Sequence, residues 1–87
     1  MTAPRLTIDL GAITANARTL VARLAPRGIR VTGVAKAVCG LPAVAEAMLR
    51  GGASGVGDSR IRNLLGMRDA GLGAPLTLIR SPMLSEV

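Results

Sequence analysis

Apolar and polar positions follow two different spacings along this chain. Residues 5–10, RLTIDL, alternate apolar and polar side chains, which predicts a half-buried strand. Between residues 13 and 24 the apolar side chains recur every three or four positions, and Pro26 and Gly28 follow, which predicts a helix that ends there. Residues 30–38 are mostly β-branched or small, which is typical of a buried strand.

The second half of the chain continues this alternation. Pro42 suits the first turn of a helix that Gly51 and Gly52 end, and residues 53–58 and 75–80 predict two more strands. Ser59 is the expected cap of the helix between those strands, and Ser81 with Pro82 predicts the start of another helix. The expected inner faces of the two middle helices are Leu41, Val44, Ala45, Met48 and Leu49, and then Ile61, Leu64 and Leu65.

Strand and helix signals that alternate in this way predict an α/β fold. The strands expected near residues 30, 53 and 75 recur every 22 or 23 residues, the rhythm of βα units with a parallel sheet and right-handed crossovers. A closed (β/α)8 barrel needs about eight strands and roughly 250 residues. We therefore expect residues 1–87 to be the N-terminal portion of such a barrel, incomplete, with about three βα units preceded by a strand and a helix.

Composition narrows the classes of function. The net charge is +6, but the arginines are scattered and the chain has no aromatic residue to stack on a base, which argues against a nucleic-acid partner. The lack of histidine removes imidazole metal ligands and Ser-His or Cys-His pairs, and no metal site is expected. The chain has a single cysteine, no leader-like apolar run and no apolar run long enough to span a membrane, so we expect a cytoplasmic protein without a membrane partner.

Lys36 is the only lysine, whereas the other ten basic residues are arginine. In an extended strand Lys36 would share a bulky face with Val34, near the strand's C-terminal end, where barrel enzymes hold their active sites. Ala35 and Ala37 would face the helices. A desolvated lysine can lose its proton and attack a carbonyl carbon, which arginine cannot do. The alternative is a lysine that extends to water from the strand end, and Cys39 is expected to be a small buried residue.

Three stretches carry a resemblance to a known family: RLTIDLGAITANARTL, VTGVAKAVCG, and GVGDSRIRNLLGMRDAGLGAPLTLIRSPMLSEV. Together they resemble the N-terminal part of the alanine racemase-like, fold-type III enzymes that use pyridoxal 5′-phosphate (PLP), and most closely the alanine/ornithine racemases. Many alanine racemases carry a tyrosine four residues after the lysine, near the cofactor phosphate. Gly40 occupies that position here, which fits the ornithine-like branch better.

The resemblance implies a function for Lys36. It implies that Lys36 holds PLP as an internal aldimine and is one of two bases that move the α-proton of an amino-acid substrate. It also implies that the full-length protein is a homodimer, and that the second base and the phosphate-binding loops lie beyond Val87. The strand at residues 5–10 would belong to a C-terminal β domain.

Other interpretations remain open at this point. The chain could be part of a PLP-binding barrel protein without racemase activity, or a basic module for acidic partners whose binding would weaken steeply with salt. Arg80 could face the cofactor from its strand end or be solvated or ion-paired. Asp58, beside Ser59 and Arg60, is expected to cap a helix start rather than contact substrate.

Overall fold

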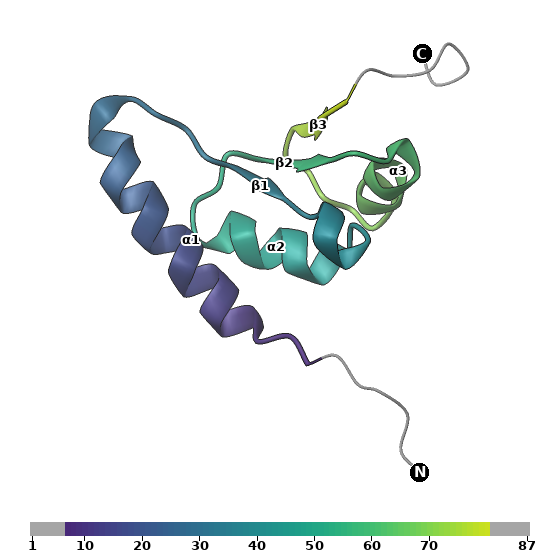
Figure 1. Cartoon of the computed structure of the whole chain (residues 1–87), viewed down its shortest axis with the longest axis horizontal. Helices are drawn as coiled ribbons and strands as arrows, with labels where there is room; N and C mark the ends of the chain where they lie inside the picture. The colour runs from purple at the N-terminus through teal and green to yellow at the C-terminus, as the bar shows by residue number, and fades with distance from the viewer. Residues whose placement is uncertain (1–6, 81–87) are drawn as a thin grey trace.

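The computed structural model describes residues 7–80 and contains a three-stranded parallel sheet in the order β1-β2-β3 (Figure 1). The first and second strands pair in parallel with Thr32 opposite Gly55, and the second and third pair in parallel with Gly57 opposite Thr77. This confirms the predicted α/β class with consecutive parallel strands. In chain order the elements are α1 (Leu10–Leu24), the 3₁₀ turn η1 (Ala25–Arg27), β1 (Thr32–Val34), the 3₁₀ turn η2 (Lys36–Val38), α2 (Pro42–Arg50), β2 (Gly55–Asp58), α3 (Ile61–Asp69) and β3 (Leu76–Leu78).

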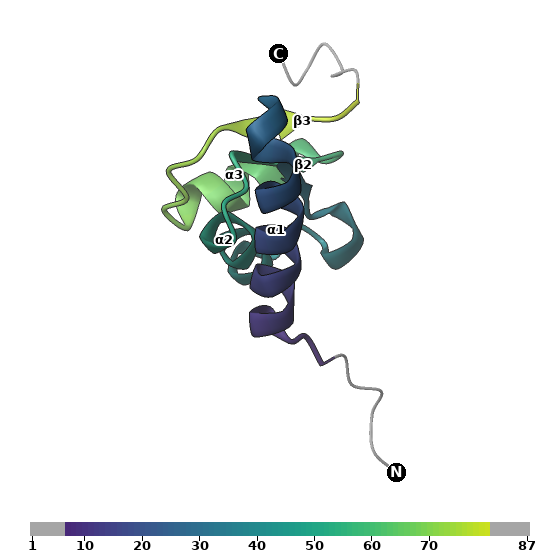
Figure 2. The same cartoon turned by 90° about the vertical axis from the view of Figure 1, so that its left-hand side faces the viewer.

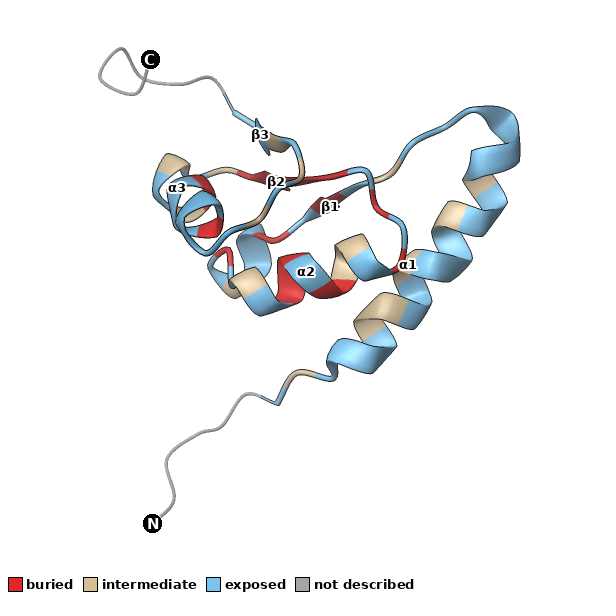
Figure 3. Ribbon diagram, turned by 180° about the vertical axis from the view of Figure 1, so that it is seen from behind, coloured by how far each residue is buried: buried red, intermediate tan, exposed pale blue. Residues whose placement is uncertain are grey.

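The core lies between the sheet and helices α2 and α3, and Figure 3 shows the buried residues gathered there. Its centre is formed by four residues that are at most 1% exposed: Ala35, Ala45, Val56 and Met67. Small residues on β1 let α2 come close, because a Cβ at Gly33 would lie 2.5 Å from the Sδ of Met48. Gly33 therefore faces α2, and the expectation that Ala35 faces the helices is confirmed.

The opposite face of the sheet is covered by no element within residues 7–80. A Cβ at Gly57 would lie 3.1 Å from the Cγ2 of Ile79 and 3.6 Å from the Cγ2 of Thr32, which places these residues on one face. Val34 and Ile79 are 46% and 41% exposed. A sheet with helices on a single face is the arrangement of a partial barrel, whose inside would be this uncovered face.

Helix α1 lies across α2, as Figures 1 and 2 show from two sides. Asp9 caps its start by accepting a hydrogen bond from the N–H of Ala12 (3.0 Å). The chain leaves the helix through η1 and Gly28, which has a φ of +72°. No residue within α1 is fully buried, and Leu20 is 48% exposed. The predicted helix is confirmed, and its apolar stripe is only half buried.

The strands predicted at 53–58 and 75–80 are found, somewhat shorter, as β2 and β3, whereas the first two predicted strands differ more from the structure. The strand predicted at residues 5–10 is wrong for the residues that the structure describes. Residues 7–9 form no strand, and Leu10 is helical because Asp9 caps the start of α1. Residues 5 and 6 lie outside the described residues. The strand predicted at 30–38 is confirmed only for Thr32–Val34. The N–H of Ala35 still bonds to Gly57, but its carbonyl accepts from Val38 and Gly40, which closes a turn. The helix predicted from Ser81 also lies outside the described residues.

The predicted inner faces of α2 and α3 need two corrections. Leu41 is 44% exposed, because it precedes the first helical turn, and Leu65 is 41% exposed. The inner face of α3 instead uses Leu64 and Met67, three positions apart, which are 6% and 0% exposed. The remaining predicted core positions of these helices are buried or half-buried, so the helices themselves are confirmed.

Candidate functional site

Lys36 lies at the carboxyl edge of the sheet, two residues after β1 ends. It opens η2 rather than ending a strand, so its predicted place in a strand is wrong, although the predicted edge of the sheet is right. Its side chain is exposed and makes no hydrogen bond or ion pair with any residue from 7 to 80. Ala37 is exposed on the same turn and does not face the helices, because the chain has left the extended conformation. The amine of Lys36 is therefore open to a ligand.

The turn that carries Lys36 closes through two residues in the left-handed region. Cys39 has a φ of +57° and Gly40 a φ of +67°. The expectation of a buried Cys39 is wrong, since this conformation leaves the residue exposed as a free thiol. Gly40 is buried against α3: a Cβ at position 40 would lie 2.5 Å from the Cβ of Asn63 and 3.1 Å from the Cε of Met67. A tyrosine at this position would have no room.

Asp58 ends the neighbouring strand, β2, and is completely buried. Its Oδ1 accepts hydrogen bonds from the backbone N–H of Arg60 (2.8 Å) and from the Nδ2 of Asn63 (3.1 Å). Asp58 therefore holds the chain just before α3, but it does not cap the helix: the N-cap is Arg60, and no side chain within residues 7–80 accepts from the N–H groups of the first turn. The helix caps predicted at Asp58 and at Ser59 are both wrong. The Oδ2 of Asp58 has no partner within the described part of the chain, and an unsatisfied buried polar atom costs about 1–3 kcal/mol.

Arg80 joins the ends of the two later strands. Its Nε donates a hydrogen bond to the carbonyl oxygen of Ser59, which follows β2. Beside it is a polar hollow of about 380 Å³ at the start of α3, lined by Arg60, Ile61, Arg62, Asn63 and Arg80. Arginines from two loops therefore gather at the same edge of the sheet as Lys36. Whether Arg80 also faces a cofactor remains a prediction.

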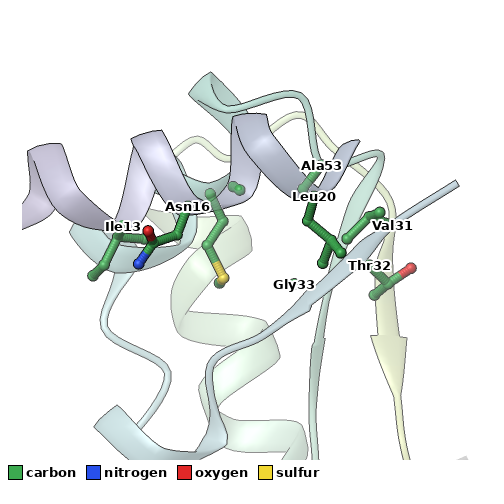
Figure 4. A pocket seen from close by; sticks show the side chains of 9 residues that line it. Ile13, Asn16, Leu20, Val31, Thr32, Gly33 and Ala53 are labelled. Atoms are coloured by element: carbon green, nitrogen blue, oxygen red, sulfur yellow. The ribbon is translucent and has the colours of Figure 1, made fainter. Parts of the chain in front are cut away.

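A second hollow, of about 340 Å³, lies at the other end of β1 (Figure 4). Ile13, Asn16 and Leu20 of α1 form one wall, and Val31 and Thr32 form another. It contains no titratable side chain, and its place near the start of β1 separates it from the Lys36 turn. We therefore assign the candidate chemistry to the carboxyl edge.

Sequence reasoning missed Asn63. A polar residue in the first turn of a predicted helix is usually read as solvent-exposed, although Asn63 lies under Gly40. Two features of the sequence could have pointed to Asn63. It follows Asp58, the acidic residue at the end of a predicted strand, by five positions, and position 40 holds a glycine, which leaves room for a neighbouring side chain. Within residues 7–80, no three Cys, Asp or Glu side chains gather as a metal site, and no helix is long and apolar enough to cross a membrane.

Comparison with known proteins gives consistent results. The family model of the alanine racemase N-terminal domain matches residues 8–87. A lysine racemase of Thermotoga maritima is 45% identical over all 87 residues, which span 25% of that protein. The crystal structure of alanine racemase from E. faecalis superposes with a TM-score of 0.81 at 31% identity, over 90% of this chain and 22% of that one. The alanine racemase from Bacillus anthracis with bound L-Ala-P gives 0.75 at 26% identity, over 92% and 23%. The chain thus spans about a quarter of the length of these relatives.

Proposed function

The chain belongs to the alanine racemase family and matches the N-terminal domain of that family. From this premise we propose that it carries the cofactor-binding lysine of a PLP-dependent amino-acid racemase. One observation supports this most directly. Lys36 is the single lysine, and its exposed amine lies on an anchored turn at the carboxyl edge of a parallel sheet. Barrel enzymes place their reacting groups at that edge.

The residues at this edge fit the aldehyde end of PLP. A C=N bond to the aldehyde carbon needs a primary amine, which the side chain of Lys36 supplies and the ten arginines cannot. Lys36 Nζ makes no ion pair with any described residue, so nothing within residues 7–80 competes for it. When bound, PLP would take up the electrons left behind as the substrate loses its α-proton.

We propose two tasks for Lys36. It holds the cofactor while the site is empty of substrate, and it then takes or returns the proton on one face of the substrate Cα. Racemisation needs a base on the other face as well. The 87 residues contain no histidine or tyrosine, so we infer that this second base comes from another part of the protein or from a second subunit of a homodimer.

The first experiment traps the cofactor on the lysine. We expect the purified 87-residue chain, mixed with PLP and reduced with borohydride, to gain a phosphopyridoxyl group on the peptide that contains Lys36, detected by mass spectrometry. Lys36→Arg is the matched control, because it keeps the charge and removes the amine. Equal labelling of this peptide in both proteins, or no labelling in the folded wild type, would contradict the proposal.

The second experiment separates a racemase from a cofactor-binding protein. A chimera in which this chain replaces the matching 87 residues of the Thermotoga maritima lysine racemase is tested on lysine, alanine, ornithine and serine by chiral chromatography. We expect racemisation of at least one amino acid, lost in the Lys36→Ala chimera, and none by the 87-residue chain alone. A folded chimera that is labelled by PLP at Lys36 but racemises none of them would favour the non-catalytic alternative.

A further inference from the structure

The turn with Lys36 rests directly on the side chain of Asn63. A Cβ at Gly40 would lie 2.5 Å from the Cβ of Asn63 and 2.8 Å from its Cγ. Distances this short leave no room for a Cβ at position 40, so the backbone of Gly40 packs directly against the Asn63 side chain. Asn63 belongs to α3 and lies 23 residues further along the chain than Gly40.

Asn63 is itself held in one orientation. Its Nδ2 donates to Asp58 Oδ1 at 3.1 Å, and the same oxygen accepts from the N–H of Arg60 at 2.8 Å. Asp58 is 0% exposed at the end of β2. The carboxylate therefore joins β2, the start of α3 and the side chain beneath Gly40.

The other end of the turn is fixed by the sheet. The N–H of Ala35 donates to Gly57 at 3.0 Å, and the carbonyl of Ala35 accepts from Gly40, also at 3.0 Å. Lys36 follows Ala35 directly, so it is carried between a sheet hydrogen bond on one side and the contact of Gly40 with Asn63 on the other. The two supports differ in kind, because only the second depends on side chains.

We propose that Asn63 is a positioning residue for Lys36, which it fixes through Gly40 while Asp58 holds the Asn63 amide. A role of Asn63 in catalysis rests on the function proposed above, whereas the contact between Asn63 and the Lys36 turn is independent of that function. The unpartnered Oδ2 of Asp58 supports the proposal. A buried carboxylate with one unsatisfied oxygen lowers stability, and such costs are typical of sites where structure is kept for function.

The first test observes Lys36 without any cofactor. Reductive methylation with ¹³C-formaldehyde labels the only lysine and the N-terminal amine, and Lys36→Arg identifies which NMR signal belongs to which. We expect Asn63→Ala to move the Lys36 signal toward its position in urea while circular dichroism still reports a folded chain. Gly66→Ala is the matched control on α3, because a Cβ there meets no atom within 4 Å. An unmoved signal in Asn63→Ala would overturn the proposal.

A charge exchange tests the link to Asp58. Asn63→Asp alone places two carboxylates face to face and should shift the Lys36 signal at least as far as Asn63→Ala. Combining it with Asp58→Asn restores a donor and an acceptor and should return the signal toward the wild type. No recovery in a folded double variant would show that the hydrogen bond does not hold the turn.

The last test approaches the contact from its other side. Gly40→Ala and Gly71→Ala both place alanine at a positive φ, +67° and +91°, but only position 40 lacks room for a Cβ. We expect PLP trapping at Lys36 to slow about tenfold in Gly40→Ala and in Asn63→Ala, because the amine is then no longer held in place, and misplacing a reacting group by about 1 Å can slow a reaction by up to about a hundredfold. Trapping should stay near the wild-type rate in Gly71→Ala. Wild-type rates in both test variants would overturn the positioning role. Failure of the wild type to trap PLP would instead contradict the proposed function, and the NMR result would still decide whether Asn63 fixes the turn.

Discussion

Replacing Gly51 with alanine should separate helix α1 from the rest of the fold. Gly51 follows α2 with a φ of −76°, so its backbone conformation suits alanine and no strain arises from the substitution itself. The obstacle is α1. A Cβ at position 51 would lie 2.5 Å from the Cβ of Ala17 and 2.6 Å from the carbonyl oxygen of Thr14. Because one of these atoms is backbone, α1 must move as a body.

The cost can be worked out from two contributions. Overpacking of a tight contact costs about 1–3 kcal/mol. Moving α1 also breaks the hydrogen bond from Thr14 Oγ1 to the carbonyl of Ala47, which is 2.8 Å long, and a bond of this kind contributes about 0.5–1.5 kcal/mol. The free energy of unfolding should therefore fall by about 2–4 kcal/mol, against a total of about 4–13 kcal/mol expected for a chain of this length.

Urea denaturation followed by circular dichroism measures this loss. With a slope of about 2 kcal/mol per molar urea, in the middle of the usual range, the midpoint should move down by roughly 1–2 M. The matched control is Gly66→Ala, an exposed helical glycine with open space around it, which should gain up to about 1 kcal/mol from helix propensity. A Gly51→Ala midpoint equal to or above that of the wild type would refute the argument that α1 and Gly51 are in contact.

Three further predictions concern stability. Met67→Ala should cost about 2–5 kcal/mol by leaving a cavity in the core, whereas Leu65→Ala, 41% exposed on the same helix, should cost far less; equal urea midpoints would contradict the burial of Met67. Thr14→Val should cost about 1 kcal/mol, and its effect should not add fully to that of Gly51→Ala, because both loosen α1; full additivity in a double-mutant cycle would show that the two sites are independent. The isolated 87-residue chain should be marginally stable, because one face of its sheet is uncovered within residues 7–80, and a sharp calorimetric transition above about 60 °C would contradict this.

The sequence predicted the elements better than their ends. Helix α1 was predictable because Ile13, Ala17 and Val21 keep helical spacing and a glycine follows the last turn. The strand around Lys36 was predicted too long, since apolar, β-branched residues favour a strand but do not show how far a partner strand extends. Here β2 ends at Asp58, where the chain turns into α3, and the register leaves Lys36 without a partner.

One part of the candidate site was predictable from the sequence and another part was not. Lys36 was found from composition, because a lone lysine among arginines is visible without any structure. The residues that hold the Lys36 turn were not found from the sequence, because the contact between Gly40 and Asn63 joins different elements and depends on how closely the turn packs against α3. A glycine at a positive φ and an asparagine in a helix each have ordinary local explanations, and only their distance from one another shows that they act together.

The order of the core residues along the chain has a consequence for synthesis. Ala35, Ala45, Val56 and Met67 meet in one cluster and come from a single continuous stretch. A ribosome that adds about 5–20 residues per second makes the part from Ala35 to Met67 in roughly 2–7 s. The four buried residues of this cluster are thus all made before β3, and only the partly buried Leu72 and Leu76, which pack against the cluster, follow them.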